Sequence, residues 1–153
     1  DRAAWGLSLD AAGARVRTSS GTTTVPPVAG DFPDCRALLR RITAVGQRVS
    51  VPARSLGDTL RAVAHLPQVT LHITGDRMTV TNEALEPCVI SGVSSAEPFT
   101  VVVNPSFLLA ALVGVIGPDV VLQLNGPLDP MVISSADDGT FTSAVMPIRP
   151  ERT

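Results

Sequence analysis

The segment RVSVPARSLGDTLRAVAHLPQVTLHITGDRMTVTN, residues 48–82, has a second copy later in the same chain. Residues 99–135, FTVVVNPSFLLAALVGVIGPDVVLQLNGPLDPMVISS, repeat its pattern at an offset of 52 in the helical part and 51 after it. The matched pairs are Val51 and Val103, Leu56 and Leu108, Leu60 and Leu112, Pro67 and Pro118, Val69 and Val120, Leu71 and Leu122, and Gly75 and Gly126. An ordered run of this length indicates an internal duplication.

Each copy has the pattern of a strand, a helix and then further strands. Pro52 and Pro105 are expected just inside the two helix starts, where the missing N–H is not needed, and the second helix is expected over residues 105–116. Alternating apolar residues follow each helix, as in a half-buried strand. The turns at Gly75-Asp76 and Asp138-Gly139 are typical of hairpins, and the third strands are expected in residues 88–93 and 141–148.

One such β-α-β-β-β unit cannot bury both faces of its elements, so two copies are expected to pack together. The predicted fold class is α+β, with duplicated β-α-β-β-β units and two helices packed on one face of antiparallel sheets.

The first part of the chain has a different pattern. Short strands are expected around turns at residues 10–13 and 19–21, followed by a helical or irregular connector over 31–42. We predict that residues 1–43 are the tail of a preceding domain plus this connector, and that residues 44–153 form a C-terminal domain.

Composition excludes several classes of protein. With 153 residues, 44% of them hydrophobic, the chain can bury a core without a metal or disulfide. Its formal charge of −2 gives no overall signal for nucleic acid. No apolar run approaches a membrane span and no signal-peptide pattern is present, so a cytoplasmic protein without membrane contact is expected.

Residues suited to catalysis or metal binding are few. Cys35 and Cys88 form no CxxC motif and have no histidine at metal-ligand spacing, so no metal or cofactor is expected. The sequence contains no GxSxG motif and no P-loop, and the carboxylates of Asp137 and Asp138 belong to a predicted hairpin turn. The chain is therefore predicted not to be an enzyme.

The end of the chain, AVMPIRPERT over residues 144–153, is unusually apolar. Met146 and Ile148 are either the last inward-facing residues of an edge strand or part of a surface that receives a partner. The residues alone leave both interpretations open.

Four separated motifs occur in the order DFPDCRALL (31–39), VVVNPSFLLAAL (101–112), NGPLDPMVI (125–133) and FTSAVMPIRP (141–150). Together with the duplication, they resemble the bacterial sliding clamp, the β subunit of DNA polymerase III, from the end of its second domain through its third. The resemblance implies a non-catalytic processivity factor, with three domains per chain and a homodimeric ring around duplex DNA.

In that family the C-terminal segment forms part of a groove for short clamp-binding peptides of polymerases, the clamp loader and repair proteins. Met, Leu and Phe side chains offer an adaptable apolar slot for such peptides. Carried over to this sequence, the groove would comprise Pro33, Leu38, Asn104, Phe107, Leu128, Pro130, Met146, Pro147, Ile148 and Arg149.

The resemblance also implies helices that contact the DNA backbone without reading its sequence, a contact that salt weakens. The residues that could serve are Arg40, Arg41, Arg48, Arg54 and Arg61. The spacing of Arg54, Asp58 and Arg61 fits a solvated helical charge pattern equally well.

Some positions depart from the family pattern. Cys35 stands where an aromatic residue is usual, and the chain continues from Pro150 to Thr153 beyond the usual end. With the segment SADDGTFTSAVMP over residues 135–147, the chain is also similar to clamp-like modules fused behind a MerR-type helix-turn-helix in some bacterial transcriptional regulators, where the module would sense or assemble. The alternative function is therefore a clamp-like interaction or sensor domain of such a regulator.

Overall fold

The computed structural model describes residues 6–10, 13–27, 30, 34–42, 46–83, 85–94, 97–137 and 141–149. The chain divides into two compact units, Asp1–Asp34 and Cys35–Thr153. The sequence had placed this division after residue 43, but helix α1 (Cys35–Ile42) groups with the second unit. The assignment of the first unit to a preceding domain stays a prediction.

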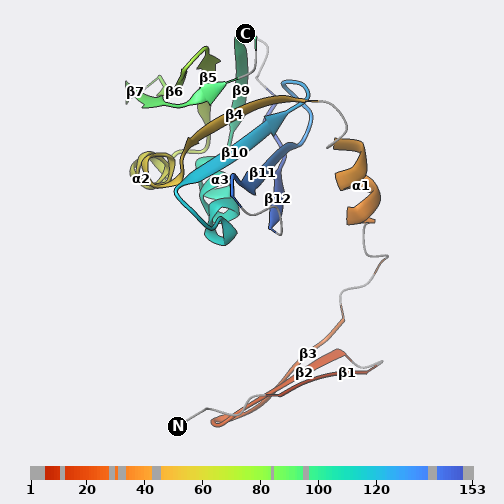
Figure 1. The fold of residues 1–153 in the computed structure, drawn as a ribbon. Helices are drawn as coiled ribbons and strands as arrows, with labels where there is room; N and C mark the ends of the chain where they lie inside the picture. The colour runs from red at the N-terminus through yellow and green to blue at the C-terminus, as the bar shows by residue number, and fades with distance from the viewer. Residues whose placement is uncertain are drawn as a thin grey trace. The chain divides into compact units, whose positions relative to one another are not determined.

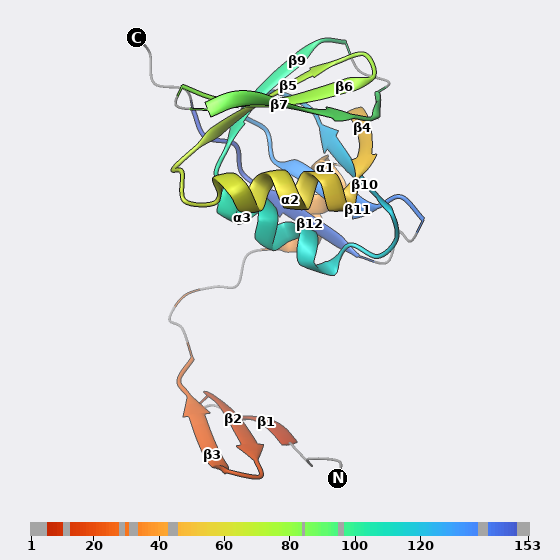
Figure 2. The same cartoon turned by 90° about the vertical axis from the view of Figure 1, so that its left-hand side faces the viewer.

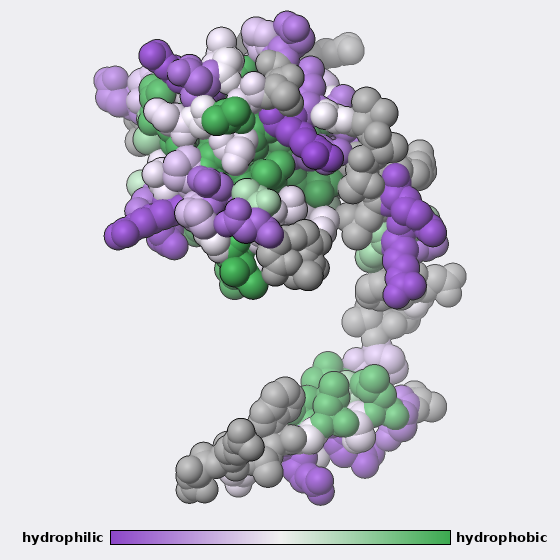
Figure 3. Space-filling view, in the orientation of Figure 1, coloured by the Kyte–Doolittle hydropathy of each residue, from purple (hydrophilic) through white to green (hydrophobic). Residues whose placement is uncertain are grey.

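The first unit is a three-stranded antiparallel sheet in the order β1-β2-β3, with β1 over Gly6–Asp10, β2 over Gly13–Thr18 and β3 over Gly21–Val25. The turn at residues 19–20 lies within the predicted turn 19–21, and Asp10 pairs with Gly13 at the ends of the other predicted turn, whose middle lies outside the described residues. Leu7 pairs with Val16 and Leu9 with Ala14, so these apolar side chains share one face of the sheet. This patch is open to solvent, since Leu9 is 75% exposed (Figure 3).

The second unit carries the remaining elements (Figure 1). After α1 these are β4 (Gln47–Pro52), α2 (Ala53–Val63), β5 (Val69–Thr74), β6 (Arg77–Asn82), β7 (Leu85–Ser91), β8 (Val93–Ser94), β9 (Phe99–Val103), α3 (Pro105–Ala111), the 3-10 turn η1 (Leu112–Gly114), β10 (Asp119–Leu124), β11 (Met131–Ser135) and β12 (Thr142–Val145). The strands form two antiparallel sheets, β12-β11-β10-β4-β8 and β7-β6-β5-β9. The prediction of an α+β fold with antiparallel sheets is confirmed.

Each sheet combines strands from both sequence copies. Strand β4 of the first copy pairs with β10 of the second, with Val51 opposite Val120. Strand β9 of the second copy pairs with β5 of the first, with Val103 opposite Val69. The duplication therefore produces an exchange of first strands, which the repeat alone did not indicate.

The helices α2 and α3 lie side by side (Figure 2); α2 contacts strands of both sheets, and α3 contacts β12. Their inward residues recur at helical spacing: Leu56, Leu60 and Val63 in α2, and Leu108 and Ala111 in α3 are all buried. They join one apolar core with the inward residues of the strands, such as Leu71 and Ile133. Both helices thus cover the same core from one side.

The helix boundaries differ from those expected. Pro52 is not inside α2: it has an extended backbone, ends strand β4 opposite Asp119, and precedes the helix as its N-cap. Pro105 does occupy the first turn of α3. That helix ends at Ala111 rather than at residue 116, because the chain tightens into η1 and is extended again at Val115.

The third strands also differ in length from the expectation. Strand β7 begins at Leu85 and ends at Ser91, after which Gly92 leads into β8 on the other sheet. Strand β12 covers only Thr142–Val145 of the expected residues 141–148. The predicted turn at Asp138-Gly139 lies outside the described residues, whereas Gly75 has the positive φ of 56° expected for the first hairpin.

Candidate functional site

The segment that follows β12 joins the edges of the two sheets. β12 is the edge strand of its sheet, and β9 is an edge strand of the other. The backbone N–H of Ile148 donates a hydrogen bond of 2.7 Å to the carbonyl oxygen of Val102 in β9. Residues 146–148 therefore cross from one sheet to the other, beside the start of α3.

A groove of about 600 Å³ lies between this segment and α3. Its lining residues are Asn104, Phe107, Ala110 and Ala111 on the helix side, and Ser143, Ala144, Val145, Met146 and Ile148 on the strand side. None of these residues carries a charge. Phe107 is 66% exposed and Met146 is 60% exposed, so each wall presents one large apolar side chain to solvent.

Asn104 determines how α3 begins. Its Oδ1 accepts hydrogen bonds from the backbone N–H groups of Ser106 (2.9 Å) and Phe107 (3.2 Å), as a helix N-cap does. Its Nδ2 donates to the carbonyl oxygen of Pro67 at 3.1 Å. Because its amide oxygen caps the helix and its amide nitrogen holds Pro67, Asn104 fixes where Phe107 lies beside the groove.

No protein-family model and no curated protein sequence matches the chain. Solved structures do match. The β sliding clamp of C. crescentus gives a TM-score of 0.75 at 20% identity, covering 95% of this chain and 41% of that one. The DNA polymerase sliding clamp of Pseudomonas aeruginosa gives 0.73 at 21%, covering 95% and 42%. A P. aeruginosa sliding clamp bound to griselimycin gives 0.71 at 21%, also covering 95% and 42%.

The chain has the fold of a sliding-clamp domain. It spans about two fifths of the length of the clamp structures it matches. At these identities the likeness concerns the fold alone.

The structure brings together four of the groove residues proposed from the sequence, namely Asn104, Phe107, Met146 and Ile148. The remaining described ones are not among the lining residues: Leu128 and Pro130 lie in the loop between β10 and β11, and Pro147 and Arg149 flank Ile148. Pro33 and the side chain of Leu38 lie outside the described residues.

The sequence interpretation missed the small residues of the groove. Ala110 and Ala111 lie three and four positions after Phe107, on the same side of α3, and their short side chains leave the space that the groove occupies. Ser143 and Ala144 belong to the opposite wall. The helical spacing from Phe107 could have indicated that the two alanines line the groove. The residues of β12 could not be predicted in this way, because their position depends on strand pairing between distant parts of the sequence.

The other sequence copy provides an internal comparison. At the offset of 52, the positions of Phe107, Ala110 and Ala111 correspond to Ser55, Asp58 and Thr59 of α2. Instead of lining an apolar slot, Thr59 contacts β7 through its Oγ1, which lies 3.3 Å from the Sγ of Cys88. The second sequence copy therefore has an apolar groove beside α3, whereas the first has polar side chains at the corresponding positions of α2.

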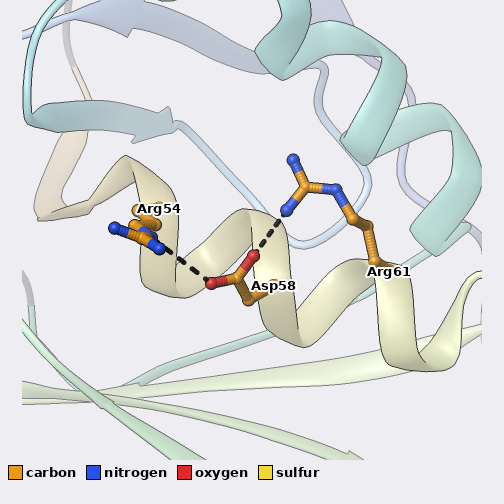
Figure 4. A network of polar contacts seen from close by, with 3 residues as sticks. All are labelled: Arg54, Asp58 and Arg61. Atoms are coloured by element: carbon orange, nitrogen blue, oxygen red, sulfur yellow. Dashed lines mark hydrogen bonds and ion pairs between the residues drawn. The ribbon is translucent and has the colours of Figure 1, made fainter.

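The arginines proposed as DNA contacts lie on different elements. Arg54 and Arg61 are on α2, and both form ion pairs with Asp58 (Figure 4). Arg48 is exposed on strand β4 and Arg40 on α1, whereas the side chain of Arg41 lies outside the described residues. On α2 one carboxylate thus offsets part of the positive charge of two guanidinium groups.

Within the described ranges, no three His, Cys, Asp or Glu side chains gather in a way that could hold a metal ion. None of the helices in the described part of the chain is long and apolar enough to cross a membrane.

Proposed function

We propose that this chain contains a non-catalytic clamp-like domain whose groove beside α3 binds short, extended, apolar peptide segments of partner proteins. The observation that supports this most directly is the pair of exposed side chains, Phe107 and Met146, facing an uncharged groove of about 600 Å³. That volume is in the range of sites that take small molecules or a few peptide side chains.

The strand wall of the groove supports an extended ligand. Among the described strands β12 lies at a sheet edge, so the backbone groups on its outer side are not used by that ladder. An extended peptide can pair with such an edge while its apolar side chains fill alternate positions. Met146 adds an unbranched, adaptable side chain at the end of this wall.

The comparisons support the same site class. Sliding clamps of Pseudomonas aeruginosa and Bartonella birtlesii are bound to griselimycin in solved structures. By the resemblance, the natural partners of this chain would be clamp-binding peptides of polymerase, clamp loader and repair proteins. The groove would be completed by a preceding domain, so binding by this chain alone is expected to be weak.

Association with duplex DNA and a homodimeric ring form the remaining part of the proposal. The exposed arginines of α2 can contact phosphates independently of sequence, but Asp58 is shared between them. We therefore expect weak binding to DNA that declines steeply with salt. The processivity role requires the parts of a clamp that this chain does not span.

The second candidate function is the interaction or sensor module of a MerR-type regulator. It is favoured by the charge balance of the helices: α2 has two arginines and one aspartate, and the segment Pro105–Ala111 has no charged residue. A module of this kind would use the same groove without encircling DNA. A helix-turn-helix in the intact protein would favour this alternative, and two further clamp-like domains would favour the ring.

The experiment is a titration of a fluorescent clamp-binding peptide with the chain and with the double variant Met146→Ala, Ile148→Ala. We expect the variant to fold and to lose most of the affinity, because the two largest exposed or half-buried apolar contacts of the strand wall are removed while Val145 in the core is kept. Val93→Ala is the matched control, since Val93 is 76% exposed on β8 and does not line the groove. If the double variant binds as tightly as the parent chain, the groove is not the peptide site.

A further inference from the structure

A second, smaller cleft lies on the other side of α3, between that helix and α2. Its volume is about 250 Å³ and its lining residues are Ala53, Gly57, Arg61, Leu109, Leu112, Val113 and Val115. None of them lines the groove described above. α3 therefore lies between the groove and this cleft, and peptide binding in the groove does not explain the cleft.

The rim of this cleft is markedly apolar for a solvent-facing surface. Val113 is 86% exposed and Ile116, just beyond Val115, is 63% exposed. Neither residue is needed to fill the core, because the segment from α3 through η1 already buries Leu108 and Ala111. Two large exposed aliphatic side chains beside an apolar cleft indicate a surface that is covered by a partner.

Gly57 forms part of the α2 wall of the cleft. It is buried in the middle of that helix, where glycine costs helix stability relative to alanine. A Cβ atom built at this position contacts only the side chain of Arg61, at 3.6 Å or more. Packing against neighbouring elements therefore does not require a glycine here, and an added methyl group would lie at the wall of the cleft.

The charge at the cleft is positive and incompletely balanced. Arg61 is the one charged residue among the described residues that line it. Its partner Asp58 also pairs with Arg54, whose side chain is 94% exposed (Figure 4). One carboxylate thus serves two guanidinium groups, so a carboxylate supplied by a partner would complete the pairing.

We propose that this cleft is a docking site for a protein segment that places one large apolar side chain between α2 and α3 and an adjoining Asp or Glu against Arg61. The cleft is smaller than the range of about 300 to 1,000 Å³ typical of small-molecule pockets, but it has room for one side chain. Arg61 is also one of the arginines proposed above to contact DNA, so the protein segment and DNA would compete for it, and a phosphodiester backbone would leave the apolar rim of Val113 and Ile116 uncovered. The proposal does not depend on peptide binding in the groove beside α3.

The test compares two blocked dipeptides, N-acetyl-Phe-Glu-amide and N-acetyl-Phe-Lys-amide, added to the complete chain while methyl NMR signals are followed. We expect the Glu peptide to shift signals of Leu109, Leu112 and Val113, with an affinity about two- to fivefold higher than the Lys peptide, as for an exposed ion pair. Arg61→Gln should abolish that difference, and Arg77→Gln, on the distant β5-β6 hairpin, should leave it unchanged.

Gly57→Ala provides the second variant. It should raise the thermal stability of the chain, because alanine favours a helix more than glycine does and the added methyl group does not clash with the backbone. It should also weaken binding of the Glu peptide, because the methyl group narrows the cleft. Loss of binding in this variant cannot then be ascribed to unfolding. The proposal is overturned if both peptides bind equally, if they shift only signals of the groove beside α3, or if Gly57→Ala leaves their affinity unchanged.

Discussion

The side chain of Asn104 connects two parts of the backbone that lie far apart in sequence. It caps α3 through the N–H groups of Ser106 and Phe107, and it holds the carbonyl oxygen of Pro67 from the loop after α2. Ser106 reinforces this link, because its Oγ donates to the carbonyl oxygen of Ala64 at 2.7 Å. The direction in which Phe107 enters the groove depends on these bonds.

We predict that Asn104→Ala lowers the free energy of unfolding by about 1–2 kcal/mol, because it removes the cap as well as the bond to Pro67. Asn104→Asp should cost less, since the carboxylate can still cap the helix but can no longer donate to the carbonyl group. Urea denaturation of the three chains measures the difference. Equal stability of all three would mean that Asn104 acts by contact with a ligand and not by positioning α3.

At the scale of single residues, the sequence was informative where the residue type within a motif suggested a role in the groove. Asn104, Phe107, Met146 and Ile148 were proposed through the resemblance of their motifs to the clamp family, and all four line the groove. The bond from Asn104 to Pro67 could not be predicted, because it joins residues 37 positions apart through the packing of α2 against α3.

Two short connections hold the sheets together at the scale of elements. Gly92 carries the chain from β7 to β8, and its N–H donates to the carbonyl oxygen of Asp76 at 2.8 Å. Residues 146–148 make the corresponding crossing after β12. Sequence patterns located β7 and β12, the third strands of the two copies, but predicted that each strand continues through the crossing that follows it. The reason is that apolar residues such as Val93 and Met146 continue the alternation after the strand has ended.

Gly92→Ala is predicted to destabilise the second unit by about 1–3 kcal/mol, the usual cost of overpacking. An added Cβ atom would lie 2.5 Å from the carbonyl oxygen of Ser50 and 2.7 Å from the Cγ1 of Val51, so β8 would have to move away from β4. Thermal unfolding checks this, with Gly57→Ala as the control for the same substitution at a site with room. An unchanged midpoint would show that β8 does not pack as closely as described.

For the whole molecule, the division into two units has an energetic consequence. The buried apolar cluster draws all its members from residues 49–145, within the second unit. The sheet β1-β2-β3 instead leaves Leu7, Leu9 and Val25 more than half exposed. Sequence patterns predicted these three strands and the α+β class correctly. The exchange of β4 and β9 between the copies was not predictable, because β5 and β10, the two strands with which each could pair, have the same alternation of apolar residues.

We predict that a chain of residues 35–153 folds by itself with the unfolding midpoint of the complete chain, because no residue of its core is removed. Circular dichroism melting of the two chains makes the comparison. A midpoint lowered by more than about 4–8 °C would correspond to the loss of roughly 1 kcal/mol and would mean that residues 1–34 contribute to the stability of the second unit.

The exchange of first strands also governs what happens while the chain is being made. When only the first copy has left the ribosome, β4 has no β10 to pair with and β5 has no β9. The apolar residues of that copy, Leu56 and Leu71 among them, then remain uncovered until residues up to about Leu124 have emerged. We therefore expect the nascent first half to be the stage at which this chain is most prone to aggregate.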